Sequence, residues 1–236
     1  MRNLIFATLV SLFSVTATLA TAAGAPSKLN AVEIDLTDKA SLQRGAHTFM
    51  NYCLSCHSAS LMRYNRMAKD LGLSEEQVSQ NLMFTTDKIG DTMQIAMRTE
   101  DAKRWFGVAP PDLSVIARAR GTDWLYTYLR TFYLDDSRPM GTNNLAFQDV
   151  GMPHVLWEQQ GYASLNDSGQ LRLTTEGELT PRQYDVMSRD LVNFLAYISE
   201  PSKLQRLALG KWVLLYLAFF FIIAYALKKA YWKDVH

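Results

Sequence analysis

Both cysteines of this 236-residue chain lie in one short segment, Cys53-Leu54-Ser55-Cys56-His57. The spacing C-x-x-C-H is the signature of covalent attachment of a c-type haem. The two thiols add across the haem vinyl groups, and the imidazole of His57 then reaches the iron from the proximal side. The segment therefore predicts one covalently attached haem c, with His57 as an iron ligand.

A thiol–disulfide couple, a zinc site and a structural disulfide are the alternatives for this cysteine pair. The reactive cysteine of a thioredoxin-like couple lies at the start of a helix, which lowers its pKa, whereas here a helical apolar pattern precedes the pair. A structural zinc ion takes four protein ligands, and a disulfide across three residues would close almost no loop. Haem attachment is favoured over all three. The helical pattern consists of Leu42, Ala46, Phe49, Met50 and Cys53.

Both ends of the chain are apolar. A basic residue, a short apolar run and small residues at the start form the pattern of a secretory signal peptide. The apolar run at 207–227 would be about 31 Å long as a helix at about 1.5 Å per residue, which matches a bilayer core. Its single charge, Lys211, lies near one edge and can snorkel to the headgroups. We therefore expect a signal peptide at 1–23, a periplasmic haem domain at 24–203, a transmembrane anchor at 204–229 and a cytoplasmic tail at 230–236, in a bacterial inner membrane.

Composition narrows the class of protein further. A net charge of +1 gives no reason to expect a nucleic-acid partner. The exported part has about 180 residues, which is enough for one hydrophobic core and more than a single haem requires. Because the chain has no further cysteines, the haem itself is expected to organise that core.

Helix signals recur along the exported part, and strand signals are nearly absent. Ser74 with Gln77 and Thr180 with Gln183 have capping-box spacing. After Thr180 an amphipathic pattern continues for about 19 residues until a proline stops it. The fold class is therefore mostly α: a haem domain with extended loops, followed by one C-terminal transmembrane helix.

Three further elements follow from local patterns. A helix is expected near 122–133, a hairpin is weakly indicated at 166–169, and long loops are expected over 134–179. Gly45, one turn before Phe49, would let another helix approach closely, and the amphipathic helix after Thr180 is the natural partner. The inward positions of the 122–133 helix are Trp124, Leu125, Tyr128, Leu129 and Phe132.

The sixth ligand of the iron decides between an electron carrier and an enzyme. A methionine thioether raises the reduction potential and closes the site, whereas an open position allows small-molecule chemistry. Met152 lies in a loop between a glycine and a proline, which can present its sulfur to a haem. Met140, in the segment Arg138-Pro139-Met140-Gly141, has a similar setting. The residues alone leave both methionines open.

The order of these motifs resembles the cytochrome c1 family of bc1 complexes over essentially the whole mature chain. The likeness rests on the C-x-x-C-H segment, WFGVAPPDLS at 105–114, RAR at 118–120, GMP at 151–153 and the tail anchor. The resemblance implies a class I cytochrome c-like fold, in which the first and last helices pack together. It also implies that Met152 is the distal ligand, Arg120 pairs with a haem propionate, Pro111 lines the pocket and Tyr126 lies near the haem. A guanidinium suits the propionate role because it offers bidentate donors.

The function that this resemblance implies is electron transfer from a Rieske iron–sulfur protein to a soluble or membrane-attached cytochrome c. Cytochrome b would carry out quinol oxidation, so the chain would be a redox subunit and not an enzyme alone. Cytochrome b, the Rieske protein, membrane lipid and a dimeric complex are the expected surroundings. The alternatives are a mono-haem subunit of a terminal oxidase or nitric oxide reductase, which usually has an N-terminal anchor, and a thiol–disulfide oxidoreductase.

Overall fold

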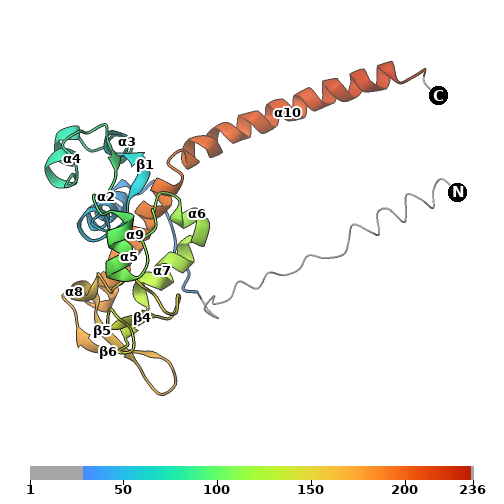
Figure 1. The fold of residues 1–236 in the computed structure, drawn as a ribbon. Coiled ribbons are helices and arrows are strands. Elements are labelled where there is room, and N and C mark those ends of the chain that lie inside the picture. The colour runs from blue at the N-terminus through green and yellow to red at the C-terminus, as the bar shows by residue number, and fades with distance from the viewer. Residues whose placement is uncertain (1–28, 235–236) are drawn as a thin grey trace.

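The computed structural model describes residues 29–234, so the expected signal peptide lies outside the described part. These residues form one helical domain, from which a long C-terminal helix projects (Figure 1). The elements are α2 (Lys39–Thr48), the π-helix η2 (Phe49–Cys53), β1 (Ala59–Arg63), α3 (Tyr64–Leu71), α4 (Glu75–Asn81), β2 (Thr92–Met93), α5 (Thr99–Phe106), α6 (Ile116–Arg120), α7 (Thr122–Arg130), β3 (Phe132–Leu134), β4 (Thr142–Asn144), α8 (Trp157–Gln160), β5 (Gly161–Leu165), β6 (Leu171–Glu176), α9 (Pro181–Ser199) and α10 (Lys203–Tyr231).

Helix α2 leads directly into the cysteine motif. It begins at the cap residue Asp38, whose carboxylate accepts the N–H of Ser41 at 3.0 Å. The helix then widens into η2, which ends at Cys53. The N–H of His57 donates to the carbonyl of Cys53 at 2.8 Å, so the chain turns tightly through the motif. The prediction that C-x-x-C-H follows a helix is confirmed.

Helix α9 lies at the centre of the domain. Thr180 and Gln183 form the expected capping box, Pro181 opens the helix, and its 19 residues end at Ser199 as predicted. The helix packs against α2, α6 and α7. Because α9 is covered on several sides, it buries 11 of its 19 residues, among them Leu191, Phe194 and Leu195.

The contact between α2 and α9 depends on Gly45. A β-carbon at this position would lie 2.1 Å from the backbone oxygen of Asp190 and 2.7 Å from Cβ of Phe194. The two helix backbones therefore approach each other more closely than any larger residue allows. The expectation that the first and last helices of the domain pack at Gly45 is confirmed.

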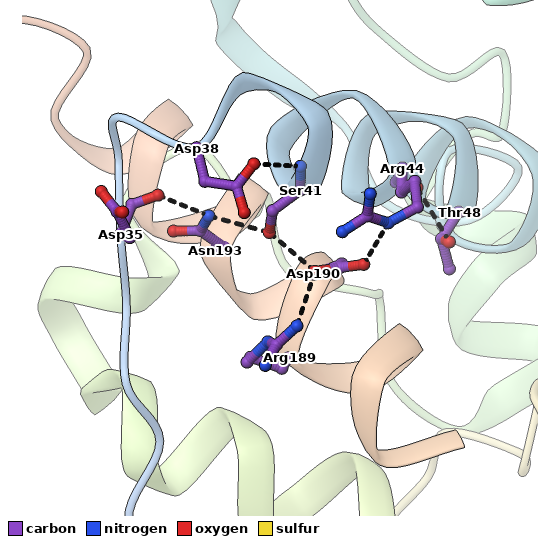
Figure 2. Close-up of polar contacts among 8 residues, drawn as sticks. All are labelled: Asp35, Asp38, Ser41, Arg44, Thr48, Arg189, Asp190 and Asn193. Atoms are coloured by element: carbon purple, nitrogen blue, oxygen red, sulfur yellow. Dashed lines mark hydrogen bonds and ion pairs between the residues drawn. The ribbon is translucent and has the colours of Figure 1, made fainter. Parts of the chain in front are cut away.

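A buried polar cluster fixes the register of the same two helices (Figure 2). The Asp190 side chain is only 2% exposed, and it accepts hydrogen bonds from Ser41 Oγ at 2.7 Å and Arg44 Nε at 2.6 Å. Asn193 donates to the carbonyl of Asp35 at 2.8 Å and to Ser41 Oγ at 3.0 Å. Since a buried carboxylate is costly without partners, sliding α2 along α9 would be unfavourable.

Replacing Gly45 by alanine is expected to lower the free energy of unfolding by about 1–3 kcal/mol, because the added methyl overpacks the helix crossing. Denaturant unfolding of the haem-loaded protein, followed by haem absorbance, measures this loss. Gly90→Ala is the matched control, since no atom lies within 4 Å of its β-carbon position. Equal stability of the two variants would show that the crossing can relax at no cost.

The described residues contain more strand than the sequence suggests. They form three two-stranded antiparallel sheets, β1–β2, β3–β4 and β5–β6. The weakly indicated hairpin at 166–169 is confirmed as the turn between β5 and β6. The expected long loops over 134–179 are wrong in part, because β4, α8, β5 and β6 occupy much of that stretch. These strands are short, so their alternation of polar and apolar residues is too brief to stand out.

The helix expected near 122–133 ends earlier than predicted. Helix α7 stops at Arg130, and Phe132 begins strand β3, where it lies opposite Asn144 of β4. Phe132 is still buried, at 2% exposure, so the prediction that it points inward holds. The sequence pattern could not reveal the strand because its partner lies ten or so residues further along the chain.

Helix α10 stands apart from the domain (Figure 1). Within residues 29–234 it is the one helix long and apolar enough to cross a membrane. None of its residues is buried against the domain. At its start, Arg206 pairs with Glu200 at 2.6 Å, which links the first turn of the helix to the end of α9. The helix extends slightly beyond the predicted span of 204–229 at both ends.

Candidate haem site

Six of the seven predicted cofactor residues, all but Tyr126, border two adjoining cavities. The larger has a volume of about 370 Å³, within the range of about 300–1,000 Å³ that is typical of cofactor pockets. The smaller, of about 80 Å³, adds Cys56. Apolar side chains from α6, α7 and α9 contribute to the wall of the larger cavity. Both cavities are bordered by Cys53, His57, Val108, Pro111 and Met152.

A backbone carbonyl holds His57 in one orientation. Its Nδ1 lies 2.8 Å from the oxygen of Pro111, and burial lowers the pKa of His57 below its ordinary value. The imidazole is therefore neutral, with Nδ1–H donating to the carbonyl. This leaves the lone pair of Nε2 free for a metal, which is the usual arrangement of a ligating histidine and its supporting acceptor.

The segment 111–114 lies along the chain that follows the cysteine motif. The N–H of Leu113 donates to the carbonyl of Ser58 at 2.7 Å, and the N–H of Ser60 donates to Asp112 Oδ2 at 3.0 Å. These bonds keep Pro111 in place against His57. Pro111 thus acts through its carbonyl as well as lining the cavity.

Met152 borders both cavities, whereas Met140 borders neither. The loop that carries Met152 presses against the segment after α5, since a β-carbon at Gly151 would lie 2.9 Å from Cγ1 of Val108. A glycine is needed for that approach. The hydroxyl of Tyr128 donates to Sδ of Met152 at 3.3 Å. Of the two methionines that the sequence leaves open, the structure brings Met152 to the site.

Tyr126 does not border either cavity. Its ring lies beneath the guanidinium of Arg130, 4.7 Å from the ring centroid. Trp124 and Tyr128, on the inward face of the same helix, border the larger cavity instead, and their rings stack 5.0 Å apart. The helical spacing predicted that Trp124 and Tyr128 point inward, whereas the family resemblance indicated Tyr126 as the aromatic residue near the haem.

Arg120 ends helix α6 at the exposed rim of the larger cavity. Its guanidinium lies over the rings of Trp124 and Phe147, 5.0 and 5.6 Å from their centroids. No carboxylate in residues 29–234 forms an ion pair with it. A cation without a counterion beside an apolar cavity suits a ligand that is largely apolar and carries an anionic edge, as haem does.

The two cysteines are not bonded to each other. Cys53 is buried, and desolvation raises the pKa of its thiol to about 12. The nucleophile of a thiol–disulfide couple needs a low pKa, so this environment counts against that alternative. A thiol facing an apolar cavity beside a neutral imidazole is suited to haem attachment.

Two thiols, an imidazole, a thioether and a lone guanidinium around one apolar cavity define the class of c-type cytochromes. Comparison with known proteins gives the family, because the model of the Cytochrome C1 family matches residues 32–235. The chain belongs to the cytochrome c1 family. Membership confirms the expectation of an electron-transport subunit of the respiratory bc1 complex, with haem c as its cofactor.

Relatives of the chain include two that are named cytochrome c1 and a third that has another name. The chain is 52% identical to cytochrome c1 of Allochromatium vinosum, with 100% of both chains covered. It is 28% identical to cytochrome c1 of Rhodospirillum rubrum, over 84% of this chain and 83% of the relative. It is also 51% identical, over 92% of this chain and 93% of the relative, to a Nitrosomonas europaea protein named ammonia monooxygenase gamma subunit.

Proposed function

We propose that this chain carries one covalently attached haem c and passes single electrons from a Rieske iron–sulfur protein to a cytochrome c. The observation that carries the proposal is the convergence of Cys53, Cys56, His57 and Met152 on adjoining apolar cavities. Haem c bound there supplies a one-electron iron couple. The chain is then a redox subunit of a quinol–cytochrome c oxidoreductase, with quinol chemistry carried out by another subunit.

The residues of the site divide the work of holding this group. Cys53 and Cys56 would tether it through two thioether bonds, and His57 would offer Nε2 because the carbonyl of Pro111 already accepts from Nδ1. Met152 would offer its thioether as a second iron ligand. A haem held by both residues would leave no open iron site for a small-molecule substrate, which favours an electron carrier over an enzyme.

Helix α10 serves as the membrane anchor in this proposal. With a signal peptide at the start, the haem domain lies in the periplasm, and the residues after about 230 lie in the cytoplasm. An unburied apolar helix of this length suits contact with lipid and with cytochrome b. The Rieske protein and a dimeric complex complete the proposed assembly.

Purification of the detergent-solubilised complex tests the proposal. A reduced-minus-oxidised spectrum should show the sharp α band of haem c, and cytochrome b and a Rieske protein should co-purify. Subunits of a terminal oxidase, a nitric oxide reductase or an ammonia monooxygenase in their place would contradict the proposed partners. Absence of the haem band would contradict the cofactor itself.

Replacing Arg120 by glutamine is expected to lower the midpoint potential of the haem, since removal of a positive charge favours the oxidised iron. Arg120 is exposed at the rim, so screening limits the effect to about 1 kcal/mol or less, equivalent to roughly 40 mV for one electron. Potentiometric titration measures the shift. Arg118→Gln is the control, since Arg118 lies on the same helix but does not border the cavity. Equal potentials in the two variants would argue against a propionate partner at Arg120.

A further inference from the structure

Two adjacent asparagines, Asn143 and Asn144, are almost fully buried at the end of strand β4, with 3% and 1% exposure. Buried amides are costly unless they are hydrogen-bonded. The segment that follows them, 145–149, leads to Met152. The bonds that these asparagines make therefore bear on the distal side of the site.

Asn144 ties the start of that segment to helix α7. Its Oδ1 accepts the N–H groups of Ala146 at 2.8 Å and Phe147 at 3.2 Å. Its Nδ2 donates to the carbonyl of Tyr128 at 2.7 Å. Tyr128 is also the residue whose hydroxyl reaches the sulfur of Met152. One amide thus connects the loop to the helix that faces the cavity.

Asn143 holds the far end of the same segment. Its Oδ1 accepts the N–H of Asp149 at 2.9 Å, and its Nδ2 donates to Asp135 Oδ2 at 2.9 Å. Asp149 is three positions before Met152. The two asparagines therefore fix the segment at both ends.

Asp149 has an unusual backbone conformation, with φ of 61°, the one positive φ outside glycine in residues 29–234. Such a conformation costs on the order of 1 kcal/mol and persists where the surroundings hold it. Arg138 supplies that support, because its guanidinium donates to the side chain and to the carbonyl of Asp149, both at 2.9 Å. Arg138, two residues before Met140, thus holds the loop of Met152 through its hydrogen bonds to Asp149.

We propose that Arg138, Asn143, Asn144 and Asp149 form a distal-loop frame, a set of positioning residues that holds the thioether of Met152 at the haem iron. The inference rests on the proposed function, in which Met152 is the distal ligand. A thioether is an uncharged and weak ligand. Ordering a free loop costs about 1–2 kcal/mol per residue. If the frame already orders the loop, less of the free energy of the methionine–iron bond is offset by the loss of loop entropy.

The test compares two buried asparagines in the haem-loaded complex. Asn144→Ala removes the bonds that fix the loop. Asn193→Ala removes a similarly buried amide that donates to Asp35 and Ser41 and to no residue of the loop (Figure 2). The readouts are the methionine–iron charge-transfer band of the oxidised protein and carbon monoxide binding by the reduced protein. Asn144→Ala should weaken the band and bind carbon monoxide, whereas Asn193→Ala should keep the band and exclude carbon monoxide.

A second pair of variants covers the case in which Asn144→Ala does not accumulate. Arg138→Gln and Asp149→Asn break the exposed ion pair, and asparagine still tolerates positive φ. Each should bind carbon monoxide more readily than the parent, to a smaller extent than Asn144→Ala. Arg98→Gln, which breaks another exposed pair at Asp101, should leave both readouts unchanged.

The outcomes separate the two proposals. An unchanged band without carbon monoxide binding in Asn144→Ala, or in Arg138→Gln where that variant replaces it, would overturn the frame while leaving Met152 as the ligand. Equal losses in Asn193→Ala would also overturn it, since the effect would then be one of general stability. Absence of the band from the parent protein would instead contradict Met152 as the ligand, and the frame proposal would fail with it.

Discussion

Met152→Leu is expected to keep its covalently attached haem while its midpoint potential falls by on the order of 100 mV or more. Axial ligands set haem potentials over about 0.8 V, and loss of a thioether removes a ligand that favours the reduced iron. Leucine has nearly the volume of methionine, so the packing between the two cavities is largely preserved. Potentiometric titration measures the shift, and carbon monoxide binding by the reduced protein reports the opened position.

Met140→Leu is the matched control for this experiment. Both methionines lie in loops next to glycine and proline, but Met140 borders neither cavity. Its replacement should leave the potential and the methionine–iron band unchanged. If Met140→Leu abolished the band and Met152→Leu did not, the assignment of the distal ligand would be reversed.

The proximal half of this site could be predicted from sequence because its signals are local. Cys53, Cys56 and His57 lie within one turn of chain, and the helix before them has an apolar pattern of its own. The same holds for α9, because the capping box at Thr180 predicts the residue at which the helix begins. Such signals need no knowledge of what packs against the element.

The distal half depends on contacts between segments far apart in the chain. Nothing near Met152 in sequence marks Tyr128, whose hydroxyl reaches its sulfur across 24 positions. Asn143 and Asn144 have the composition of a surface turn, yet pairing with β3 buries them and directs their amides into the loop. Pattern reasoning therefore singled out Met152, the proposed ligand, but not the residues that hold its loop.

The position of Tyr126 outside both cavities has a related cause. A family motif transfers a role to a position, and a shift of two residues on a helix moves a side chain to another face. Tyr126 accordingly meets Arg130, while Trp124 and Tyr128, four apart, face the cavity together. The helical periodicity of this chain was a better guide to the aromatic wall than the resemblance was.

A chain that stops after Lys203 is expected to fold around its haem, appear in the soluble periplasmic fraction and support no electron transfer from quinol. Helix α10 contributes no buried residue to the domain, so its removal leaves the core and both cavities intact. An apolar helix of this length has no partner in the small haem core and is stable in a bilayer. The haem spectrum and potential of the truncated chain should match those of the parent.

A chain that stops after Trp232 is the control, because it keeps the whole of α10. It should remain in the membrane fraction with full activity, which would assign the effect to the helix and not to the tail. Loss of haem from the shorter chain would mean that α10 supports the domain after all. Retained haem with retained quinol-dependent activity would mean that the periplasmic domain alone holds the complex together. The expected pattern, haem kept and activity lost, separates the two tasks of the chain. The domain ending at α9 carries the electron, and α10 holds that domain next to the subunits that supply the electron.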